Sequence, residues 1–263
     1  MEGDRKVLRD GPVRLEALDD GAIWRAVLNT PKANILDMEK CDILSEVFLE
    51  AGREASLKAV VIEGEGPHFS FGASVGEHLP EQIHAMLSGF HGLFYRILDS
   101  GVVTLAAVRG QCLGGGMELA IFCNRLFASP DAAMGQPEII LGVLAPVASV
   151  MLADRVGRGR AENILLSGAS LNAEEGLAIG LVDELADDPG EAALEYARKH
   201  LLPKSASSLR LALRATRSGY QERFRAELAR VEDLFLEELM ATDDAVEGLQ
   251  AFLQKRHPEW KDR

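Results

Sequence analysis

Three things are scarce in this sequence: long apolar runs, cysteines and positive charge. No apolar run reaches the roughly 18 residues that a membrane-spanning helix needs. The first residues, MEGDRKVLRDG, lack the apolar centre of a secretion signal. The three cysteines, Cys41, Cys112 and Cys123, are odd in number and form no CxxC pair. We therefore expect no membrane segment, no disulfide framework, no zinc site and a cytoplasmic, reducing location.

The shortage of positive charge bears on the partners of the protein. The chain has 28 Lys and Arg against 41 Asp and Glu, a formal net charge of −13. Such a surface repels phosphate backbones, so we expect no nucleic-acid partner, although a local basic patch for one anionic ligand stays compatible. With 263 residues, 47% of them hydrophobic, the chain can form one large domain or a core with an appendage.

Short β-like runs alternate with helical patterns in the first part of the chain, which predicts an α/β fold with parallel strands and crossover helices. Helical spacing of apolar residues covers 37–55, with Asp37 as N-cap, and 80–98. From about residue 190, amphipathic helical patterns follow one another with no strand between them. We therefore expect an α/β core over 1–190 and a helical region over 191–263. The predicted strands are 22–29, 58–64, 102–110 and 125–130.

Residues 110–120, GQCLGGGMELA, place three glycines directly before an apolar helix that contains Glu118. The first N–H groups of a helix have no internal acceptor, and glycine lets a ligand oxygen come close to them. The motif is neither GxGxxG nor GxxxxGK[ST], so it fits a nucleotide-phosphate loop poorly. It fits an oxyanion site with Glu118 as acid or base one turn inside. A tight turn with close helix–strand packing is an equally weighted alternative.

Two further stretches could complete such a site. GPHFSFGASVGEHLP (66–80) contains a small Gly72-Ala73-Ser74 turn, whose backbone N–H would be a second oxyanion donor. MGQPEIILG (134–142) places Glu138 after Pro137. By itself, QPE is more often a helix start than a catalytic site. Two glutamates and two donors together are much rarer by chance than any one of them.

Several of these motifs, in this order, resemble the crotonase (enoyl-CoA hydratase/isomerase) superfamily. The resemblance implies a repeated ββα spiral core with a helical C-terminal trimerisation region, in a homotrimer or a dimer of trimers. It also implies an acyl-CoA substrate, no further cofactor and no metal. The matching stretches are LNTPKAN (28–34), FSFGAS (69–74), AAVRGQCLGGGMELAIFCN (106–124), MGQPEIILG (134–142), LLSGASLNAEEGLAIGLVDE (165–184) and EGLQAFLQKR (247–256).

The resemblance also implies roles for individual residues. Ala73 and Gly115 match the two residues whose N–H groups hold the thioester oxygen. Glu118 and Glu138 match the acid/base pair of the hydratases. The implied substrate- and CoA-binding residues are Lys32, Ala33, Phe71, Gly72, Ser74, Gly114, Pro137, Pro146, Phe252 and Lys255, of which the last two often reach the CoA across a subunit boundary.

This chain departs from the family pattern around the expected acyl group. Ser74 stands where an aspartate is usual, Phe71 is large where a small residue is common, and Pro146 and Val147 replace a Gly-rich run. We therefore expect hydration of a cyclic dienoyl-CoA thioester through an enolate, as in anaerobic aromatic degradation. A straight-chain enoyl-CoA hydratase is the alternative. An isomerase needs only one base, and a non-catalytic CoA- or RNA-binding relative fits poorly with the acidic charge.

Other polar residues have simpler interpretations. His84 and His91 lie seven residues apart without carboxylate or cysteine partners at ligand spacing, so we do not expect them to bind a metal. Arg210, Arg214 and Arg217 follow helical spacing and are expected to form a solvated helix face.

Overall fold

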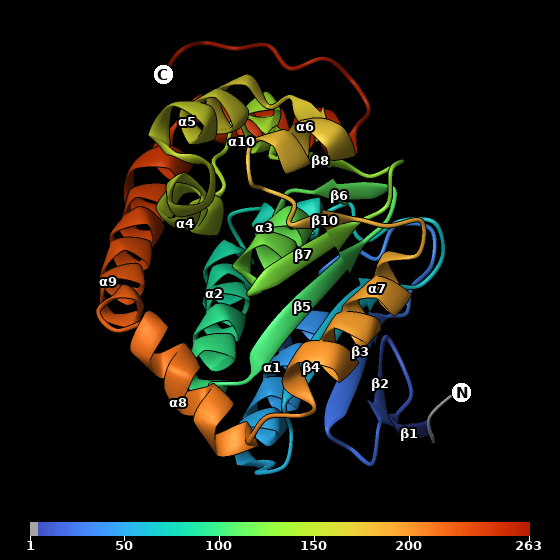
Figure 1. The fold of residues 1–263 in the computed structure, drawn as a ribbon. Helices are drawn as coiled ribbons and strands as arrows, with labels where there is room; N and C mark the ends of the chain where they lie inside the picture. The colour runs from blue at the N-terminus through green and yellow to red at the C-terminus, as the bar shows by residue number, and fades with distance from the viewer. Residues whose placement is uncertain (1–4) are drawn as a thin grey trace.

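The computed structural model describes residues 5–263, which form two β-sheets enclosed by helices (Figure 1). The larger sheet has seven strands in the order β1-β2-β3-β4-β5-β7-β10. From β3 onward neighbouring strands are parallel, as the alternation of strand and helix patterns predicts. Its strands are β1 (Lys6–Arg9), β2 (Val13–Leu18), β3 (Ile23–Leu28), β4 (Ala59–Gly64), β5 (Val103–Val108), β7 (Arg125–Ala128) and β10 (Glu184–Leu185).

The sequence analysis missed the strands at both edges of this sheet. β1 and β2 pair antiparallel, and β2 pairs antiparallel with β3, so a hairpin extends the parallel part of the sheet. The other edge ends at β10, a strand of two residues. The four predicted strands correspond to β3, β4, β5 and β7 and are confirmed.

A smaller sheet contains β6 (Gln111–Leu113), β8 (Ala133–Gly135) and β9 (Ser170–Asn172), in that order. Ser70 adds a parallel bridge to Cys112, so residues 70–74, here called the 70s segment, continue this sheet. Successive turns of the chain therefore place one strand in each sheet before the next helix: β4 with the 70s segment, β5 with β6, and β7 with β8. This is the expected ββα spiral.

The helices between these strands cover one face of the larger sheet. α1 (Met38–Arg53) begins after Asp37, whose side chain accepts from Lys40 N as the predicted N-cap. α2 (Ile83–Ser100) starts three residues later than the apolar pattern suggests, after the short 3₁₀ helix η1 (Val75–His78) and a turn. α1, α2 and α3 (Gly115–Phe122) bury their apolar sides against the sheet in one continuous core.

The opposite face of the sheet is covered in part by α7 (Pro189–Tyr196), which a π-helical turn, η3 (Ala197–Leu201), extends. Their apolar residues form a second, smaller cluster with Val61, Leu105 and Phe127 of the strands. The expected boundary between 190 and 191 falls inside α7. The division of the chain into two domains stays a prediction.

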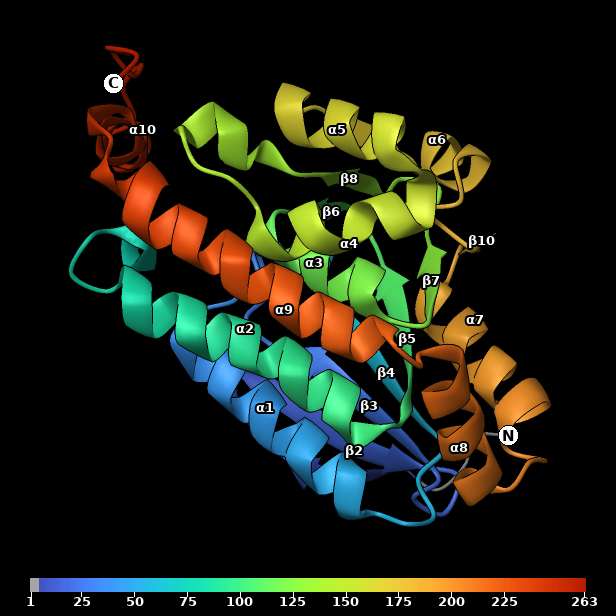
Figure 2. The same ribbon diagram turned by 90° about the vertical axis from the view of Figure 1, so that its left-hand side faces the viewer.

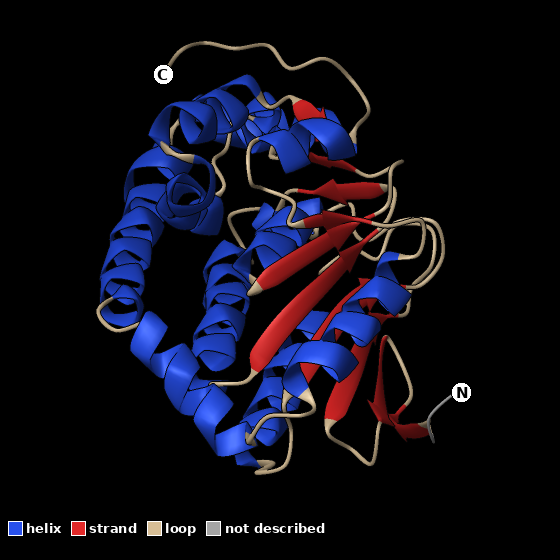
Figure 3. Cartoon of the chain, viewed as in Figure 1, coloured by secondary structure: helices blue, strands red, loops and turns tan. Residues whose placement is uncertain are grey.

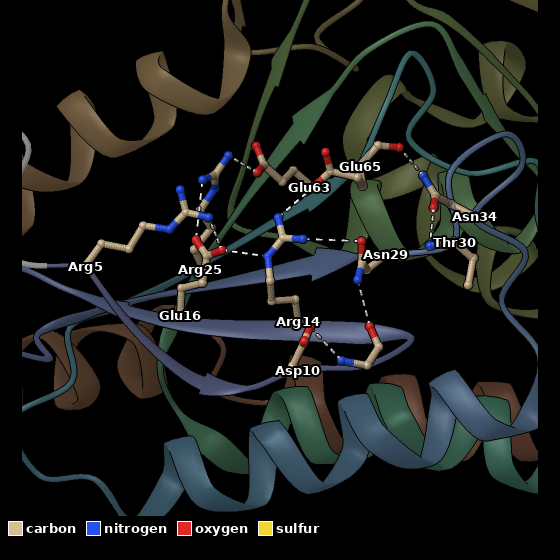
Figure 4. Close-up of polar contacts among 11 residues, drawn as sticks. Arg5, Asp10, Arg14, Glu16, Arg25, Asn29, Thr30, Asn34, Glu63 and Glu65 are labelled. Atoms are coloured by element: carbon tan, nitrogen blue, oxygen red, sulfur yellow. Dashed lines mark hydrogen bonds and ion pairs between the residues drawn. The ribbon is translucent and has the colours of Figure 1, made fainter.

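A network of charges lies on the same sheet face near the hairpin (Figure 4). The carboxylate of Glu16 is fully buried and paired with three arginines, Arg5, Arg14 and Arg25, the second at 2.7 Å. Arg25 also pairs with Glu63. Burial raises the pKa of the Glu63 carboxyl, and the positive charge of Arg25 offsets only part of this shift. Since side chains of a strand alternate between faces, the same strands supply apolar residues to the main core.

The C-terminal part is helical, as expected, and wraps around the core (Figures 2 and 3). α8 (Ala206–Thr216) is followed by α9 (Tyr220–Asp233), which packs on α2 and α4 (Pro146–Val156). Short turns η4 (Leu234–Glu238) and η5 (Leu239–Ala241) lead to α10 (Asp243–Leu253). The remaining elements are the 3₁₀ helix η2 (Pro137–Leu141), α5 (Arg158–Ser167) and α6 (Ala173–Ala178).

The expectation of a solvated arginine face on α8 was wrong for two of its three residues. Arg210 donates to the carbonyl oxygens of Ser100 at 2.7 Å and Glu54 at 2.7 Å, at the ends of α2 and α1. Arg217 lies over the ring of Phe122, and burial lowers the pKa of its guanidinium. Only Arg214 is exposed. The helical spacing was right, but the face it defines is partly an attachment of α8 to the core.

Candidate active site

A small hollow of about 60 Å³ lies between the glycine loop (residues 114–116), η1, η2 and α10. It brings together segments that are far apart in the sequence. Among the expected site residues, Phe71, Gly72, Ala73, Gly114, Pro137 and Glu138 line it. The other lining residues, which the sequence analysis did not identify, are Val75, His78, Leu141, Val143 and Leu249.

The position of Ala73 results from how residues 70–74 are held. Leu113 N donates to Ser70 O at 2.9 Å, and Leu36 N donates to Gly72 O at 2.9 Å. Ala73 therefore lies in a parallel bridge with Leu36, in an extended segment rather than in the small turn that we expected. Two neighbouring chains fix this segment on either side, so the direction of the Ala73 N–H is set by the fold.

The N–H groups of Ala73 and Gly115 lie side by side. A Cβ added to Gly115 would be 3.2 Å from Ala73 N, and a Cβ added to Gly72 would be 3.5 Å from Gly115 N. Within residues 5–263, neither N–H has a hydrogen-bond acceptor. Gly115 is buried and Ala73 is half-buried. Backbone N–H groups shielded from water are almost always paired, so two adjacent free donors indicate a place for a ligand oxygen.

Close approach explains two of the three glycines. Gly114, the N-cap of α3, has φ +50°, and a Cβ there would lie 2.6 Å from Glu138 Oε1. A Cβ on Gly116 would lie 2.6 Å from the Cβ of Ser70. Any larger residue would push the Glu138 carboxylate out of place or separate α3 from the 70s segment. The sequence analysis gave close helix–strand packing as the alternative to an oxyanion site. The structure has both the close packing of these glycines and the two free donors.

Glu118 lies one turn inside α3 and is buried. Its Oε1 accepts from Ala148 N at 2.8 Å, so the carboxylate caps the N-terminus of α4. Burial raises the pKa of Glu118 to about 7, while the N–H groups of Ala148 and Val147 lower it. The run LAPVASV thus contains the start of α4. The N–H groups of Val147 and Ala148 point at Glu118, and Pro146, which has no N–H, occupies the first helical position, where no donor is needed.

Glu138 projects from η2 and is the second carboxylate of the site. Burial, and next the negative charge of Glu118, raise its pKa to about 8. The side-chain amide of Gln136 lies against this carboxylate, and with its nitrogen turned toward Glu138 it would donate to Oε2 at 3.0 Å and Oε1 at 3.2 Å. The charge of one glutamate therefore disfavours ionisation of the other, so the pair with one ionised and one protonated carboxyl is favoured over the pair with two ionised carboxylates.

A second hollow, of about 240 Å³, begins on the other side of Glu138 and Val143, which line both hollows. Its walls are largely apolar and come from η2, the segment before α4, and α5. Pro146 and Val147 are buried and line neither hollow. Their expected contact with an acyl group stays a prediction.

The remaining expected binding residues lie outside the small hollow. Ala33 O accepts from Phe71 N at 2.9 Å, which places the loop with Lys32 next to its rim. Ser74 precedes η1, and its carbonyl accepts from the His78 ring. Phe252 and Lys255 are exposed near the end of α10. α10 itself reaches the hollow through Leu249, which lies in the EGLQAFLQKR stretch but was not among the expected site residues.

The remaining observations concern metal ions, the expected histidines of α2 and membranes. Within the described part of the chain, no group of three or more His, Cys, Asp or Glu side chains is arranged to hold a metal ion. The buried His91 pairs through Nδ1 with Glu232 of α9, which joins α2 to the C-terminal helices. Among residues 5–263, no helix combines the length and apolar character needed to cross a membrane.

Comparison with known proteins gives one consistent family. Residues 19–263 match the family described as enoyl-CoA hydratase/isomerase. The chain is 51% identical to the cyclohexa-1,5-dienecarbonyl-CoA hydratase of Thauera aromatica, over 96% of this chain and 98% of that one. It is 34% identical to the 2,3-dehydroadipyl-CoA hydratase of Escherichia coli (strain K12), over 90% and 94%.

Solved structures agree with the sequence relatives. An enoyl-CoA hydratase from Mycobacterium avium subsp. paratuberculosis K-10 superposes with a TM-score of 0.84 at 26% identity, covering 97% of this chain and all of that one. With a nearly full-length family match and relatives well above 30% identity, the chain belongs to the enoyl-CoA hydratase/isomerase family, the crotonase superfamily.

Proposed function

We propose that this protein is an acyl-CoA hydratase that adds water to a cyclic dienoyl-CoA thioester. The observation that carries the proposal is the pair of free N–H groups, on Ala73 and Gly115, beside the buried Glu118 and the half-buried Glu138. A thioester oxygen held by both donors gains negative charge when water attacks the conjugated double bond. One such donor contributes about 3–4 kcal/mol to a transition state of this kind.

The two glutamates supply the proton transfers. Hydration needs a base that takes a proton from water and an acid that gives one to carbon. A pair with one ionised and one protonated carboxyl presents one of each at the same time. Proton transfer and charge stabilisation are sufficient for this addition, so we propose no cofactor beyond the CoA of the substrate.

The acyl group is inferred from the relative and from the shape of the site. The Thauera aromatica protein, 51% identical, is named a hydratase of cyclohexa-1,5-dienecarbonyl-CoA, which favours the same substrate and a role in anaerobic aromatic degradation here. The small hollow has mostly apolar walls and is bordered by Phe71 and Leu141. A flat ring fits such a space without the rotamer entropy that a flexible chain loses.

The rest of the proposal concerns assembly and CoA binding. The loop with Lys32 and Ala33 lies beside the rim and would contact the CoA. Phe252 and Lys255 are exposed and would reach a CoA across a subunit boundary in a homotrimer or a dimer of trimers. We propose a cytoplasmic location, where acyl-CoA substrates are made and used.

A panel of thioesters tests the proposal. Initial hydration rates are measured with cyclohexa-1,5-dienecarbonyl-CoA, crotonyl-CoA and a longer straight-chain enoyl-CoA. We expect kcat/KM for the ring to exceed that for the chains by on the order of 100-fold, since mismatched methylenes cost about 1–3 kcal/mol each. Equal rates would indicate a general enoyl-CoA hydratase, double-bond migration without hydration an isomerase, and binding without turnover a non-catalytic relative.

A further inference from the structure

His78 lines the small hollow, and neither the motifs nor the family match assigns it a role. It is the last residue of η1, directly after the segment that carries Ala73. Of the side chains that line the hollow, only those of His78 and Glu138 can form hydrogen bonds, and the others are apolar. An imidazole in an otherwise apolar wall is therefore the main polar feature that a ligand meets besides Glu138 and the backbone donors.

The hydrogen bond on one ring nitrogen fixes the chemistry of the other. Nδ1 lies 2.8 Å from the carbonyl oxygen of Ser74. A carbonyl can only accept, so Nδ1 carries the proton and donates it. Burial lowers the pKa of His78, which favours the neutral ring. In that tautomer Nε2 has a lone pair and is an acceptor, and no residue between 5 and 263 forms a hydrogen bond to it.

Hydration creates a group that needs such an acceptor. The attacking water gives one hydrogen to the base, and the other stays on the new hydroxyl. In a hollow with apolar walls, that hydrogen is costly to leave without a partner. A bound water makes on average about three hydrogen bonds, and a single carboxylate cannot fix both its position and its orientation.

We infer that His78 accepts, through Nε2, a hydrogen bond from the attacking water and from the hydroxyl group that this water becomes. His78 thus selects hydroxylated over unhydroxylated acyl groups and orients the water for addition. The inference rests on the proposed function, because it assumes that the acyl group of a CoA thioester occupies this hollow.

Two substitutions separate this role from a structural one. In His78→Asn the amide nitrogen can replace Nδ1 and keep the bond to Ser74, but nothing replaces Nε2. In His78→Gln the longer amide reaches the position of Nε2 with an acceptor oxygen and gives up the bond to Ser74. The ligands are 2-hydroxycyclohexanecarbonyl-CoA and cyclohexanecarbonyl-CoA, which differ only in the hydroxyl. Their dissociation constants are measured by titration calorimetry, initial hydration rates give kcat and KM, and thermal melts confirm folding.

The expected result is a change in discrimination. The wild type binds the hydroxylated ligand more tightly, and His78→Asn loses about tenfold or more of this preference while binding of the unhydroxylated ligand changes little. His78→Gln keeps most of the preference and has a higher kcat than His78→Asn. If both variants weaken the two ligands equally, or if Asn retains the preference and Gln loses it, His78 only supports the loop and the inference is wrong.

The proposed function fails in a different way. A wild type that hydrates no thioester in the panel and binds neither inhibitor overturns both proposals. A wild type that hydrates the ring but shows no preference between the two inhibitors overturns only the role of His78.

Discussion

Replacing Gly115 by alanine tests the oxyanion site with the smallest available change. The added Cβ would lie 3.2 Å from Ala73 N, 3.3 Å from Ala73 Cβ and 3.0 Å from the Cζ atom of Phe90. The methyl group would therefore cover the Ala73 N–H, while the N–H of residue 115 stays in place. Unlike Gly114, Gly115 has no left-handed φ, so the substitution causes no backbone strain of that kind.

The expected loss follows from one missing donor. Removing a single oxyanion donor costs about 3–4 kcal/mol in the transition state, which corresponds to about 10²–10³-fold in rate. The donor acts mainly on the charged intermediate, so kcat and kcat/KM fall together. Contact with Phe90 is tighter than normal packing, so we also expect the free energy of unfolding to fall by about 1–3 kcal/mol.

The assay measures initial hydration rates by the loss of the conjugated thioester's absorbance, with chemical denaturation of the same samples. Gly92→Ala is the matched control, because it is in α2 and its Cβ would meet nothing within 4 Å. We expect Gly92→Ala to keep full activity and to gain up to about 1 kcal/mol of stability. A folded Gly115→Ala variant with kcat/KM within about threefold of the wild type would refute the oxyanion role of Ala73.

Three further predictions concern the glutamates and the C-terminal helices. Glu118→Gln and Glu138→Gln should each lower the hydration rate by about 10²–10⁴-fold and leave acyl-CoA binding largely intact. Steady-state kinetics measure the rate and titration calorimetry the binding. Near-normal turnover in either variant would remove the substituted glutamate from the mechanism. Because the folded-state pKa of Glu138 is raised to about 8, its contribution to stability is present at low pH and is lost as the pH rises toward and through 8. Glu138→Gln should therefore be more stable than the wild type at pH 8.5 and differ less at pH 5 in denaturant unfolding, and a constant difference contradicts this. Arg210→Ala should lower the free energy of unfolding by about 2 kcal/mol, while the exposed Arg214→Ala on the same helix should change it by less than about 0.5 kcal/mol; equal effects would mean that the carbonyl contacts of Arg210 are dispensable.

Much of the local structure could be predicted from the sequence because its causes are local. The apolar spacing of 37–55 and the cap at Asp37 are properties of one helix, and both are confirmed. The strands that correspond to β3, β4, β5 and β7 are short apolar runs between turn residues. The glycines before Glu118 mark a helix N-terminus because their effect on the backbone depends on no distant residue.

The site itself depends on pairings between distant segments, which no local pattern records. Ala73 faces Gly115 because Leu36 and β6 hold the 70s segment from both sides. The Glu118 carboxylate meets the first N–H groups of α4, and this contact, with burial, decides its pKa. No sequence spacing predicts such a contact, because it depends on how two helices pack.

The same reason explains what the sequence analysis missed or misjudged. Arg210 has the helical spacing of a solvated residue, but α8 packs where its guanidinium meets the carbonyl ends of α1 and α2. His78 and Leu249 belong to the hollow only because η1 and α10 meet there. The sequence by itself thus determined the elements and the reactive groups that they carry. Tertiary packing decided which of these groups face one another, because burial and distance set hydrogen bonding and charge, and both arise only when the segments come together.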